Sequence, residues 1–296
     1  MILEVIGLTK SYGSDLILDD LNWKIQEPQI IALVAPNGTG KTTLLNILTD
    51  LESYQEGSIK IGGKQLNDRS LFSELSYMQD NSILYNELTG AEHLQFIAEM
   101  YHKTAEDIAQ VVEIVGIGGY IHKRVAKYSL GMKQHLLFAL GILPNPKLFL
   151  LDEPLNGLDP DSVITVRNIL KKMHAAGTTI IFSSHNLGEV IKLTETILFL
   201  HEGKLKALQD VLRHEEKWSL IIKDTQLIED FLIAQAISYQ VKTTHKIEIT
   251  SSPQKFEQLK KFIDDNQIEV WNIEKIPWDL EEIYLELFWG LSDDEI

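Results

Sequence analysis

A glycine-bearing turn that follows an apolar run carries the residues with the clearest chemistry. Residues 35–42 read Ala-Pro-Asn-Gly-Thr-Gly-Lys-Thr, the looser form of the phosphate-binding loop, in which Ala replaces the first Gly. Gly38 and Gly40 would let successive backbone N–H groups approach phosphate oxygens without a side chain in the way. Lys41 would reach the β- and γ-phosphates, the Thr42 hydroxyl would hold Mg²⁺, and the helix that begins there would add the positive end of its dipole. The stretch predicts a site for a nucleoside triphosphate.

One residue of this loop departs from the usual pattern. Ala35 stands where glycine is usual, and its methyl group could crowd the turn and lower the affinity for nucleotide. A tight turn that binds nothing is the alternative, but the β-branched run 30–34 before the loop and the helix after it favour a binding site. The predicted nucleotide-binding residues are therefore Ala35, Pro36, Asn37, Gly38, Thr39, Gly40, Lys41, Thr42 and Thr43.

Two carboxylates end a second apolar run. Residues 148–153 read Leu-Phe-Leu-Leu-Asp-Glu, a buried strand whose acidic pair would lie at the ligand edge of an open parallel sheet. Asp152 would hold Mg²⁺ opposite Thr42, and Glu153 would polarise the attacking water. A solvated acidic turn before Pro154 is the alternative, but it leaves four apolar residues leading into two unpaired carboxylates.

Four further residues indicate a function only in combination with the phosphate loop. His185 ends the predicted buried strand 178–184; a lone His is usually structural, but at this edge it could sense the γ-phosphate. Tyr12 lies in a polar turn, where it is either an exposed aromatic or a ring that stacks on adenine. Ser129 and Gly131 begin an apolar helix, which is either an ordinary helix start or a second anion-binding N-terminus.

The elements that would position these residues describe an α/β domain. Residues 1–29 predict a β-hairpin, and Gln79 follows a short strand. Residues 85–127 change character: Thr89-Gly-Ala-Glu is a capping box that begins one helix, and Thr104 begins another. We therefore predict a helical insertion, with a helical subdomain spanning about residues 85–145.

Composition excludes several classes of protein. The 296 residues contain no Cys, so a disulfide framework and a thiolate metal site are both ruled out. A formal charge of −16 disfavours nucleic acid, which requires a basic face. No apolar run is long enough to span a membrane, and the N-terminal residues predict a strand rather than a signal peptide. If the protein works at a membrane, we expect a partner chain to hold it there.

The pattern restarts after Gly203-Lys-Leu, residues 203–205. It predicts a strand, a helix, a hairpin, a helix and a strand, the β-α-β-β-α-β order of a ferredoxin-like module within a domain of residues 216–296. A last helix over 279–291 would place an apolar stripe on one face; covering the small sheet is the favoured role and docking a partner helix the other. The stripe consists of Leu280, Ile283, Tyr284, Leu287, Phe288 and Leu291.

Taken together, the motifs of residues 1–215 resemble the ATPase subunit of ATP-binding-cassette (ABC) transporters. Tyr12 matches the adenine-stacking aromatic, residues 35–43 the Walker A motif and Gln79 the Q-loop glutamine. Residues 129–132 match the signature, residues 148–153 Walker B, residues 156–159 the D-loop and His185 the switch histidine. Leu130 and Met132 depart from the usual Leu-Ser-Gly-Gly-Gln signature, and this form looks like that of bacterial drug- and peptide-export cassettes.

The resemblance implies a fold and a mechanism. The fold would be a P-loop NTPase domain of residues 1–215 with a helical subdomain, followed by the small α+β module. ATP with Mg²⁺ would lie between two ATPase subunits, identical or homologous, contacting Ser129, Gly131 and the D-loop residue Asp159. Glu153, His185 and Gln79 would act in hydrolysis, with Gln79 also a metal ligand beside Thr42 and Asp152.

The family also implies a location and a partner. A separate transmembrane permease would hold the protein at the inner, cytoplasmic face of the cell membrane, and Gln79 with the helical insertion would couple closure of the ATPase pair to it. We expect export of a peptide, antibiotic or other amphipathic cargo. The alternative is an importer whose C-terminal domain senses a small molecule. A cassette that acts on ribosomes or DNA is set aside, because the chain has one set of motifs, a short helical insertion and an acidic composition.

Overall fold

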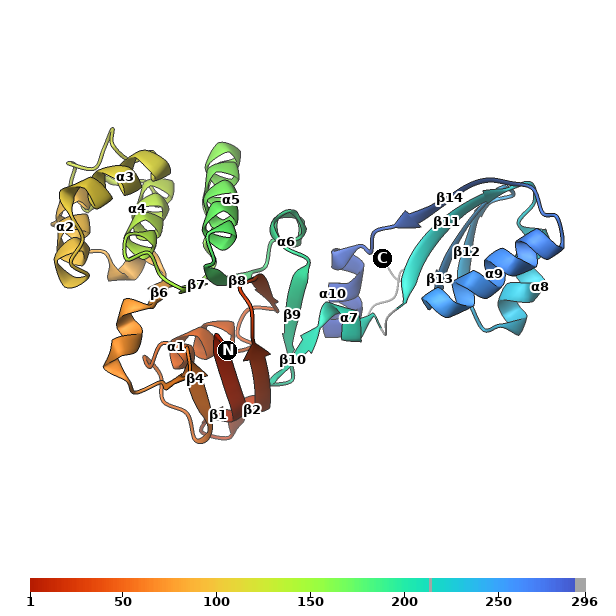
Figure 1. Cartoon of the computed structure of the whole chain (residues 1–296), viewed down its shortest axis with the longest axis horizontal. Helices are drawn as coiled ribbons and strands as arrows, with labels where there is room; N and C mark the ends of the chain where they lie inside the picture. The colour runs from red at the N-terminus through yellow and green to blue at the C-terminus, as the bar shows by residue number, and fades with distance from the viewer. Residues whose placement is uncertain (213–214, 291–296) are drawn as a thin grey trace. The chain divides into compact units, whose positions relative to one another are not determined.

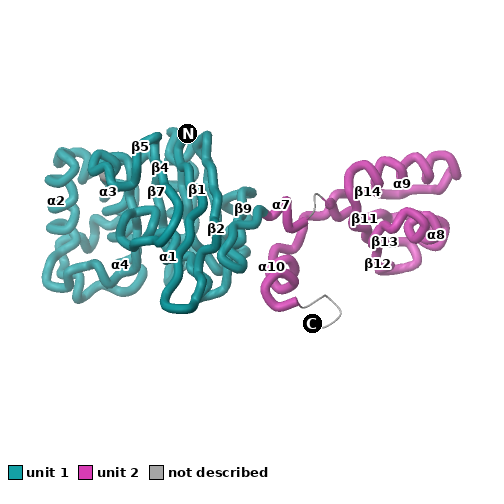
Figure 2. Tube along the Cα trace, turned by 90° about the horizontal axis from the view of Figure 1, so that it is seen from below, with its two compact units in different colours: residues 1–207 teal, residues 208–296 magenta. Residues whose placement is uncertain are grey.

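The computed structural model describes residues 1–212 and 215–290, which form two compact units, Met1–Ala207 and Leu208–Ile296 (Figure 2). In the first unit, a four-stranded antiparallel sheet has the order β2-β1-β4-β5. Its strands are β1 (Leu3–Tyr12), β2 (Asp15–Ile25), β4 (Glu56–Ile61) and β5 (Lys64–Gln65). The hairpin predicted for residues 1–29 is confirmed as β1 and β2.

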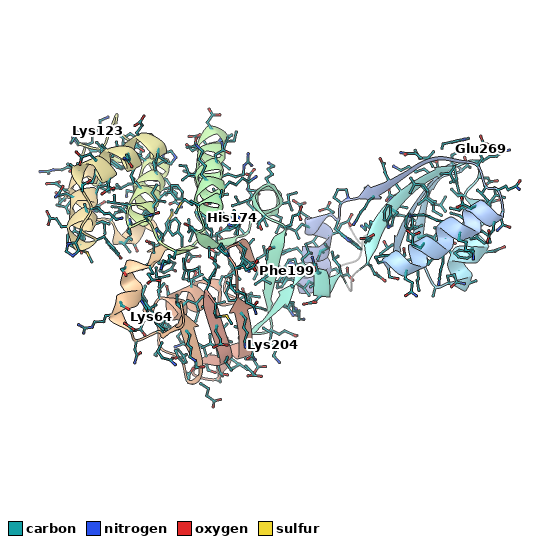
Figure 3. The ribbon with its side chains drawn as sticks, viewed as in Figure 1. Lys64, Lys123, His174, Phe199, Lys204 and Glu269 are labelled. Atoms are coloured by element: carbon teal, nitrogen blue, oxygen red, sulfur yellow. The ribbon has the colours of Figure 1, made fainter. Side chains whose placement is uncertain are left out.

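A six-stranded sheet forms the core of the first unit, in the order β10-β9-β3-β8-β7-β6. All but β10 run parallel, and every residue of β3, β7 and β8 is buried, as expected for strands covered on both faces. Phe199 of β9 is also fully buried (Figure 3). The strands are β3 (Ile30–Val34), β6 (Leu75–Met78), β7 (Leu148–Leu151), β8 (Thr179–Ser184), β9 (Thr196–His201) and β10 (Lys204–Ala207).

Helices connect these strands along the chain. In Figure 1, α2, α3 and α4 lie side by side, in agreement with the predicted helical insertion. The predicted capping box is present: Thr89 Oγ1 accepts from Glu92 N, and the Glu92 carboxylate accepts from Thr89 N. The helices are α1 (Lys41–Leu48), α2 (Gly90–Met100), α3 (Ala105–Val115), α4 (Leu130–Ile142), α5 (Pro160–Ala175) and α6 (Leu187–Leu193), with 3₁₀ turns at Arg69–Ser73, Asn81–Ile83 and Val125–Lys127.

The second unit has its own sheet and core. Its antiparallel sheet has the order β12-β13-β11-β14, and Trp218 stacks on Phe256 of α9 inside an apolar cluster between sheet and helices. The elements are α7 (Leu208–Val211), β11 (Glu216–Ile222), α8 (Gln226–Ala234), β12 (Ser238–Thr243), β13 (Lys246–Ser251), α9 (Pro253–Asp265), β14 (Val270–Ile276) and α10 (Leu280–Trp289). From β11 to β14 they follow the predicted order.

Helix α10 carries most of the predicted apolar stripe. Leu280 and Ile283 are buried, and Glu282 accepts a hydrogen bond from Lys217 of β11 at 2.5 Å. Leu291, the last predicted member of the stripe, lies outside the described residues. Among the described residues, no helix is both long and apolar enough to cross a membrane.

Candidate functional site

Four parallel strands end at one edge of the six-stranded sheet, and predicted site residues follow each of them. The phosphate loop follows β3, Gln79 follows β6, Asp152 and Glu153 follow β7, and His185 follows β8. Because β3, β8, β7 and β6 are parallel neighbours in that order, their carboxyl ends lie side by side. This is the edge at which open α/β sheets bind ligands.

The phosphate loop has the backbone that its glycines predict. Gly38 and Gly40 have φ angles of 81° and 107°, a region that glycine enters at no steric cost. A Cβ on Gly40 would lie 2.5 Å from Ile17 Cγ2, so a side chain does not fit there. Helix α1 begins directly after Gly40, and no side chain caps its N-terminus. Its first N–H groups are therefore available to an anion.

Lys41 lies inside this loop. The side chain is 6% exposed, and Nζ donates to the carbonyl oxygens of Ala35 at 2.6 Å and Pro36 at 3.1 Å. Burial lowers the pKa of Lys41, and the negative charges of Glu153 and Asp152 oppose that shift. The ammonium thus lies among neutral acceptors that it can exchange for phosphate oxygens.

The other residues of the predicted loop support its shape or face solvent. Thr39 Oγ1 donates to Pro36 O at 2.8 Å, which closes the turn before α1. Asn37 is exposed, Thr43 is half-buried, and Ala35 is fully buried at the start of the loop.

Thr42 and Asp152 meet across the sheet edge. Thr42 Oγ1 donates to Asp152 Oδ2 at 2.7 Å, although the two residues are 110 positions apart. The other carboxylate oxygen, Oδ1, accepts from Ser183 Oγ at 2.5 Å. No group of three or more His, Asp or Glu side chains in the described part of the chain could hold a metal by itself. The hydroxyl and carboxylate oxygens of Thr42 and Asp152 are, however, ligands that Mg²⁺ accepts when it keeps waters and substrate phosphates.

Glu153 adopts a backbone conformation that is uncommon for a residue with a side chain. Its φ angle is 49°, and such left-handed residues cost about 1 kcal/mol or more and concentrate at functional sites. Its N–H donates to Ser183 Oγ at 2.8 Å, and its carbonyl oxygen accepts from Gln134 Nε2 at 3.1 Å. Its carboxylate Oε2 lies 2.9 Å from His185 Nδ1. The backbone is fixed on both sides while the carboxylate points to His185.

Ser183 and Gln134 contribute to this site, and sequence reasoning missed both. Ser183 is fully buried in β8 and joins the backbone of Glu153 to the carboxylate of Asp152. A polar residue two positions before His185 in an apolar strand was the available signal for Ser183. Gln134 lies in the apolar helix α4 and is 7% exposed. A buried glutamine in an apolar helix was the signal there, because buried polar groups need a partner.

We predict that Ser183→Ala lowers both stability and ATP turnover. The substitution leaves the Glu153 N–H and Asp152 Oδ1 without their buried partner, at a cost of about 1–3 kcal/mol in the free energy of unfolding. Turnover should fall by roughly tenfold or more, the rate equivalent of one hydrogen bond to a charged group. Urea unfolding and ATPase rates at increasing Mg²⁺ measure the two effects.

Ser184→Ala is the matched control for this prediction. Ser184 is also buried in β8, but its Oγ accepts from Asn186 N at 3.0 Å. We expect Ser184→Ala to lower stability without raising the Mg²⁺ concentration that gives half-maximal turnover. An equal effect of both variants on that concentration would contradict a specific role for Ser183.

Three of the other predicted site residues have structural contacts of their own. Ser129 is exposed and its Oγ accepts from Met132 N at 3.3 Å, so it caps α4 while its O–H proton stays free to donate. A Cβ on Gly131 would lie 3.6 Å from Gly157 O. Both oxygens of Asp159 accept from Ser162, an α5 cap that lowers the pKa of Asp159. In the described residues, no hydrogen bond joins any of the three to the phosphate loop.

In the described residues, no hydrogen bond joins Tyr12 or Gln79 to the phosphate loop either. Tyr12 ends β1 and is 48% exposed. Gln79 forms no direct hydrogen bond to Thr42 or Asp152 in the described residues. It instead lines a hollow between β6 and the helices α2 and α4.

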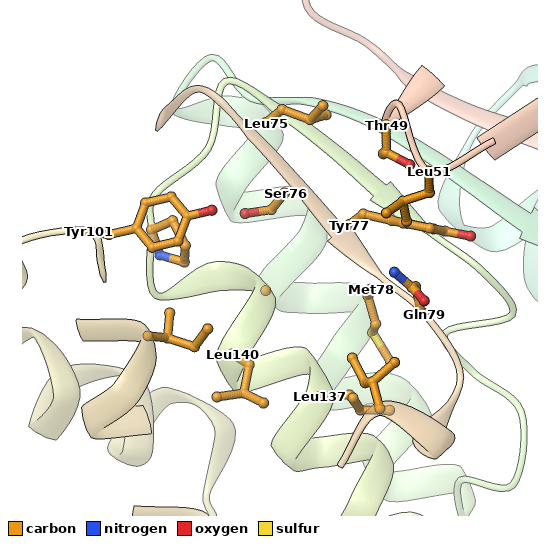
Figure 4. Close-up of a pocket in the computed structure, with 14 residues that line it drawn as sticks. Thr49, Leu51, Leu75, Ser76, Tyr77, Met78, Gln79, Tyr101, Leu137 and Leu140 are labelled. Carbon is orange, nitrogen blue, oxygen red and sulfur yellow. The ribbon is translucent and has the colours of Figure 1, made fainter. Parts of the chain in front are cut away.

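This hollow continues into an apolar groove. It has a volume of about 240 Å³, with Tyr101 and Ser76 at one end and Gln79 with Tyr77 at the other (Figure 4). Ile83, Ile97 and Leu140 also line a second hollow of about 560 Å³, here called the α2 groove. The α2 groove is lined by Ile83, Leu84, Tyr85, Glu87, Leu88, His93, Phe96, Ile97 and Leu140.

His93 fixes the wall of the α2 groove. It is 7% exposed; Nδ1 lies 2.8 Å from Thr89 O, and Nε2 lies 3.0 Å from Tyr85 N. A carbonyl oxygen can only accept and an N–H can only donate, so these partners select the neutral ring with its proton on Nδ1. Tyr85 and Phe96 remain exposed beside it, at 69% and 59%. Apolar side chains gathered around a hollow are typical of a protein-binding surface.

A phosphate loop, a carboxylate pair and a histidine at one edge of a parallel sheet define a nucleoside triphosphatase. Residues 18–156 match the family model described as ABC transporter. The lantibiotic transport ATP-binding protein SrtF of Streptococcus pyogenes is 37% identical over 69% of this chain and 88% of its own length. The bacitracin transport ATP-binding protein BcrA of Bacillus licheniformis is 32% identical over 98% of both chains. A solved structure of an ATP-binding subunit of an ABC transporter superposes with a TM-score of 0.66 and 27% identity, over 72% of this chain and 92% of that one.

The chain therefore belongs to the family of ABC transporter ATP-binding proteins. It is the ATPase subunit of an ABC transporter, it binds ATP, and such subunits act with permease partners. The resemblance derived from its motifs is confirmed, as is the ABC ATPase α/β fold.

Proposed function

We propose that this ATPase powers export of a peptide, antibiotic or other amphipathic cargo through a separate transmembrane permease. The names of the lantibiotic and bacitracin transport relatives support a peptide or antibiotic cargo. The signature form Ser-Leu-Gly-Met at residues 129–132 supports export as the direction. The observation that carries the enzymatic part is the meeting of Thr42, Asp152, Glu153 and His185 at one sheet edge.

We assign roles to the residues from these contacts. Lys41 exchanges the carbonyls of its own loop for oxygens of the β- and γ-phosphates, while the free N–H groups of α1 receive the same anion. Glu153 orients the attacking water and accepts its proton. His185, held against Glu153 by the Nδ1 contact, faces the γ-phosphate with the other side of its ring.

Thr42 and Asp152 would hold Mg²⁺, with Gln79 approaching them as the two subunits close. The ion, when bound, neutralises charge on the phosphate oxygens. The hydrogen bond from Ser183 to Asp152 Oδ1 leaves Oδ2 directed at Thr42, so the pair already presents two oxygens to one point.

The second half of the nucleotide site would come from another ATPase subunit, in the simplest case a second copy of this chain. The exposed Ser129 keeps a hydroxyl proton to donate, Gly131 leaves room for a phosphate beside it, and α4 adds its N-terminal dipole. Asp159 would act indirectly, by fixing the D-loop through its cap on α5. The phosphates would neutralise repulsion between two acidic chains, and hydrolysis would remove that bridge.

The remaining parts of the chain fit the same proposal. Residues 1–215 would be the nucleotide-binding domain and residues 216–296 an accessory domain. The sheet order β12-β13-β11-β14 and the alternation of strands and helices support a ferredoxin-like architecture for the accessory domain. The permease would hold the protein at the cytoplasmic face of the membrane.

We further propose that the permease docks in the α2 groove. The groove is almost wholly apolar, and Phe96, Tyr85 and Leu88 expose rings and methyl groups around it. Through Ile83 and Ile97 it continues into the hollow that Gln79 lines, so an occupant of the groove would reach the residue that connects to the nucleotide site. An amphipathic segment of the permease fits these properties.

Phe96→Glu tests this docking site. Because Phe96 is 59% exposed, we expect the variant to fold and to bind ATP as the wild type does. A charge in an apolar contact should abolish co-purification with a co-expressed transmembrane permease partner and the stimulation of ATPase by that permease. Ile114→Glu, on α3 and 52% exposed, is the matched control and should retain both. Full association of Phe96→Glu with the permease would exclude this docking site.

A further inference from the structure

Tyr12 does not stand alone at the end of β1, because a buried lysine lies against its ring. Lys10 Nζ is 4.6 Å from the centroid of the Tyr12 ring, a distance at which a cation is attracted to the aromatic face. Lys10 is only 4% exposed, whereas Tyr12 is 48% exposed. The ammonium therefore covers part of the ring and leaves the rest open to a ligand.

Lys10 is itself fixed by groups that follow the phosphate-loop helix. Its Nζ donates to Glu52 Oε1 at 2.7 Å and to Ser53 O at 2.6 Å. The hydrogen bond from Lys10 is the main cause that lowers the pKa of Glu52. The charged pair is thus a preformed contact between β1 and the segment that follows α1.

Gln55 adds a second connection between the same two segments. Ser11 N donates to Gln55 Oε1 at 3.0 Å, Gln55 Nε2 donates to Ser11 O at 3.1 Å, and Gln55 N donates to Thr9 O at 3.0 Å. These bonds flank Lys10 on the strand that carries Tyr12. The aromatic ring is therefore tied to the same segment as helix α1, which begins at the phosphate loop.

We propose that Lys10, held by Glu52 and Ser53, is a positioning residue that sets the Tyr12 ring for an adenine base. This inference rests on the proposed role of Tyr12 at the nucleotide site. The cation on one side of the ring restricts its orientation before nucleotide arrives, so less conformational freedom is lost on binding. The opposite side stays free to stack on a base. The connections through Glu52 and Gln55 hold the ring-bearing strand against the segment that follows α1, and so fix where the ring lies relative to that segment.

A double-mutant cycle on the full chain separates this role from a structural one. Lys10→Gln removes the charge but keeps an amide donor for Glu52 and the Ser53 carbonyl, and Lys10→Arg keeps the charge. Affinities for ATP and for inorganic tripolyphosphate, both with Mg²⁺, are measured by calorimetry for these variants, for Tyr12→Ala and for Lys10→Gln/Tyr12→Ala.

We expect Lys10→Gln to weaken ATP binding by roughly three- to tenfold, the range of a cation–aromatic contact, and to leave tripolyphosphate affinity within about twofold. In the Tyr12→Ala background the same change should weaken ATP binding by less than about twofold, since the ring through which Lys10 acts is gone. Lys10→Arg should stay within about threefold of the wild type for ATP.

Equal losses for ATP and tripolyphosphate, or an undiminished effect of Lys10→Gln without the Tyr12 ring, would overturn the inference. Retained tripolyphosphate binding also shows that each variant is folded. If the wild type bound tripolyphosphate but showed no preference for ATP, the proposed role of Tyr12 would be refuted, and the role of Lys10 that rests on it would be refuted as well. A wild type that prefers ATP, with Lys10→Gln unchanged from it, refutes only the role of Lys10.

Discussion

Glu153→Gln is expected to reduce steady-state ATP hydrolysis by roughly 10²- to 10⁴-fold, the contribution of a positioned general base. The amide keeps the size of the side chain and an oxygen within reach of His185 Nδ1, which now lies 2.9 Å from the carboxylate. It cannot accept the proton of the attacking water. ATP should therefore bind with nearly unchanged affinity while phosphate release stops. Radiolabelled phosphate release at saturating MgATP measures the loss.

Glu189→Gln is the matched control for that prediction. Glu189 is a glutamate near His185 in the sequence, but it lies on α6. There it pairs with Arg167 at 3.0 Å and with Lys192 at 2.7 Å. Its loss should lower stability and leave turnover within about twofold, because neither ion pair contacts Asp152, Glu153 or His185. Hydrolysis by Glu153→Gln at the wild-type rate would show that another group acts as the base.

Lys41→Met should have the largest effect on ATP affinity. Methionine has a similar length and is also accommodated by apolar surroundings, so the loop should keep its fold. The variant loses a charge-assisted bond to each of two phosphates, which weakens ATP binding by roughly 10- to 100-fold per bond. Fluorescent ATP titration or calorimetry gives the dissociation constants of variant and wild type.

The pH dependence of ATP binding tests the same residue. Burial lowers the pKa of Lys41 in the free protein, and a bound phosphate, being an anion, would raise it again. Binding therefore takes up a proton once the pH exceeds the free-protein pKa, so ATP affinity should fall as the pH rises toward 10. Lys172→Met, an exposed residue of α5, should keep this pH dependence, and Lys41→Met should lose it. An affinity independent of alkaline pH in the wild type would mean that Lys41 does not contact phosphate.

Local sequence was sufficient to predict the parts of the site that a single segment builds. The phosphate loop needs only its own glycines, with φ angles of 81° at Gly38 and 107° at Gly40. Asp152 could be placed because an apolar run ends there, and parallel strands bring their ends to one edge. The capping box at Thr89 likewise depends on residues three positions apart.

Contacts between distant segments could not be predicted in this way. Ser183 bonds Asp152 because β7 and β8 pair with Leu151 opposite Phe182, a register that the sequence does not state. The positive φ of Glu153 is supported by Ser183 and Gln134, which come from two other elements. The same holds for Lys10, whose partners Glu52 and Ser53 lie more than 40 positions away.

Asp159 shows that a residue in a predicted motif can also have a local structural role. The residue lies after β7, where the D-loop was predicted, but both carboxylate oxygens are engaged by Ser162 at the start of α5. An aspartate before Pro160 is a strong N-cap, and that local role takes its hydrogen-bonding capacity. Direct nucleotide contact from Asp159 would require this cap to open, whereas Ser129 can donate a proton without losing its cap.

The most direct test of the account is the molar mass of Glu153→Gln in solution, measured by light scattering with MgATP, with MgADP and without nucleotide. ATP held between two copies predicts a shift from the 33.7 kDa monomer to twice that mass with MgATP alone. A protein that stays monomeric while saturated with MgATP would contradict the central claim that the triphosphate joins two of these chains.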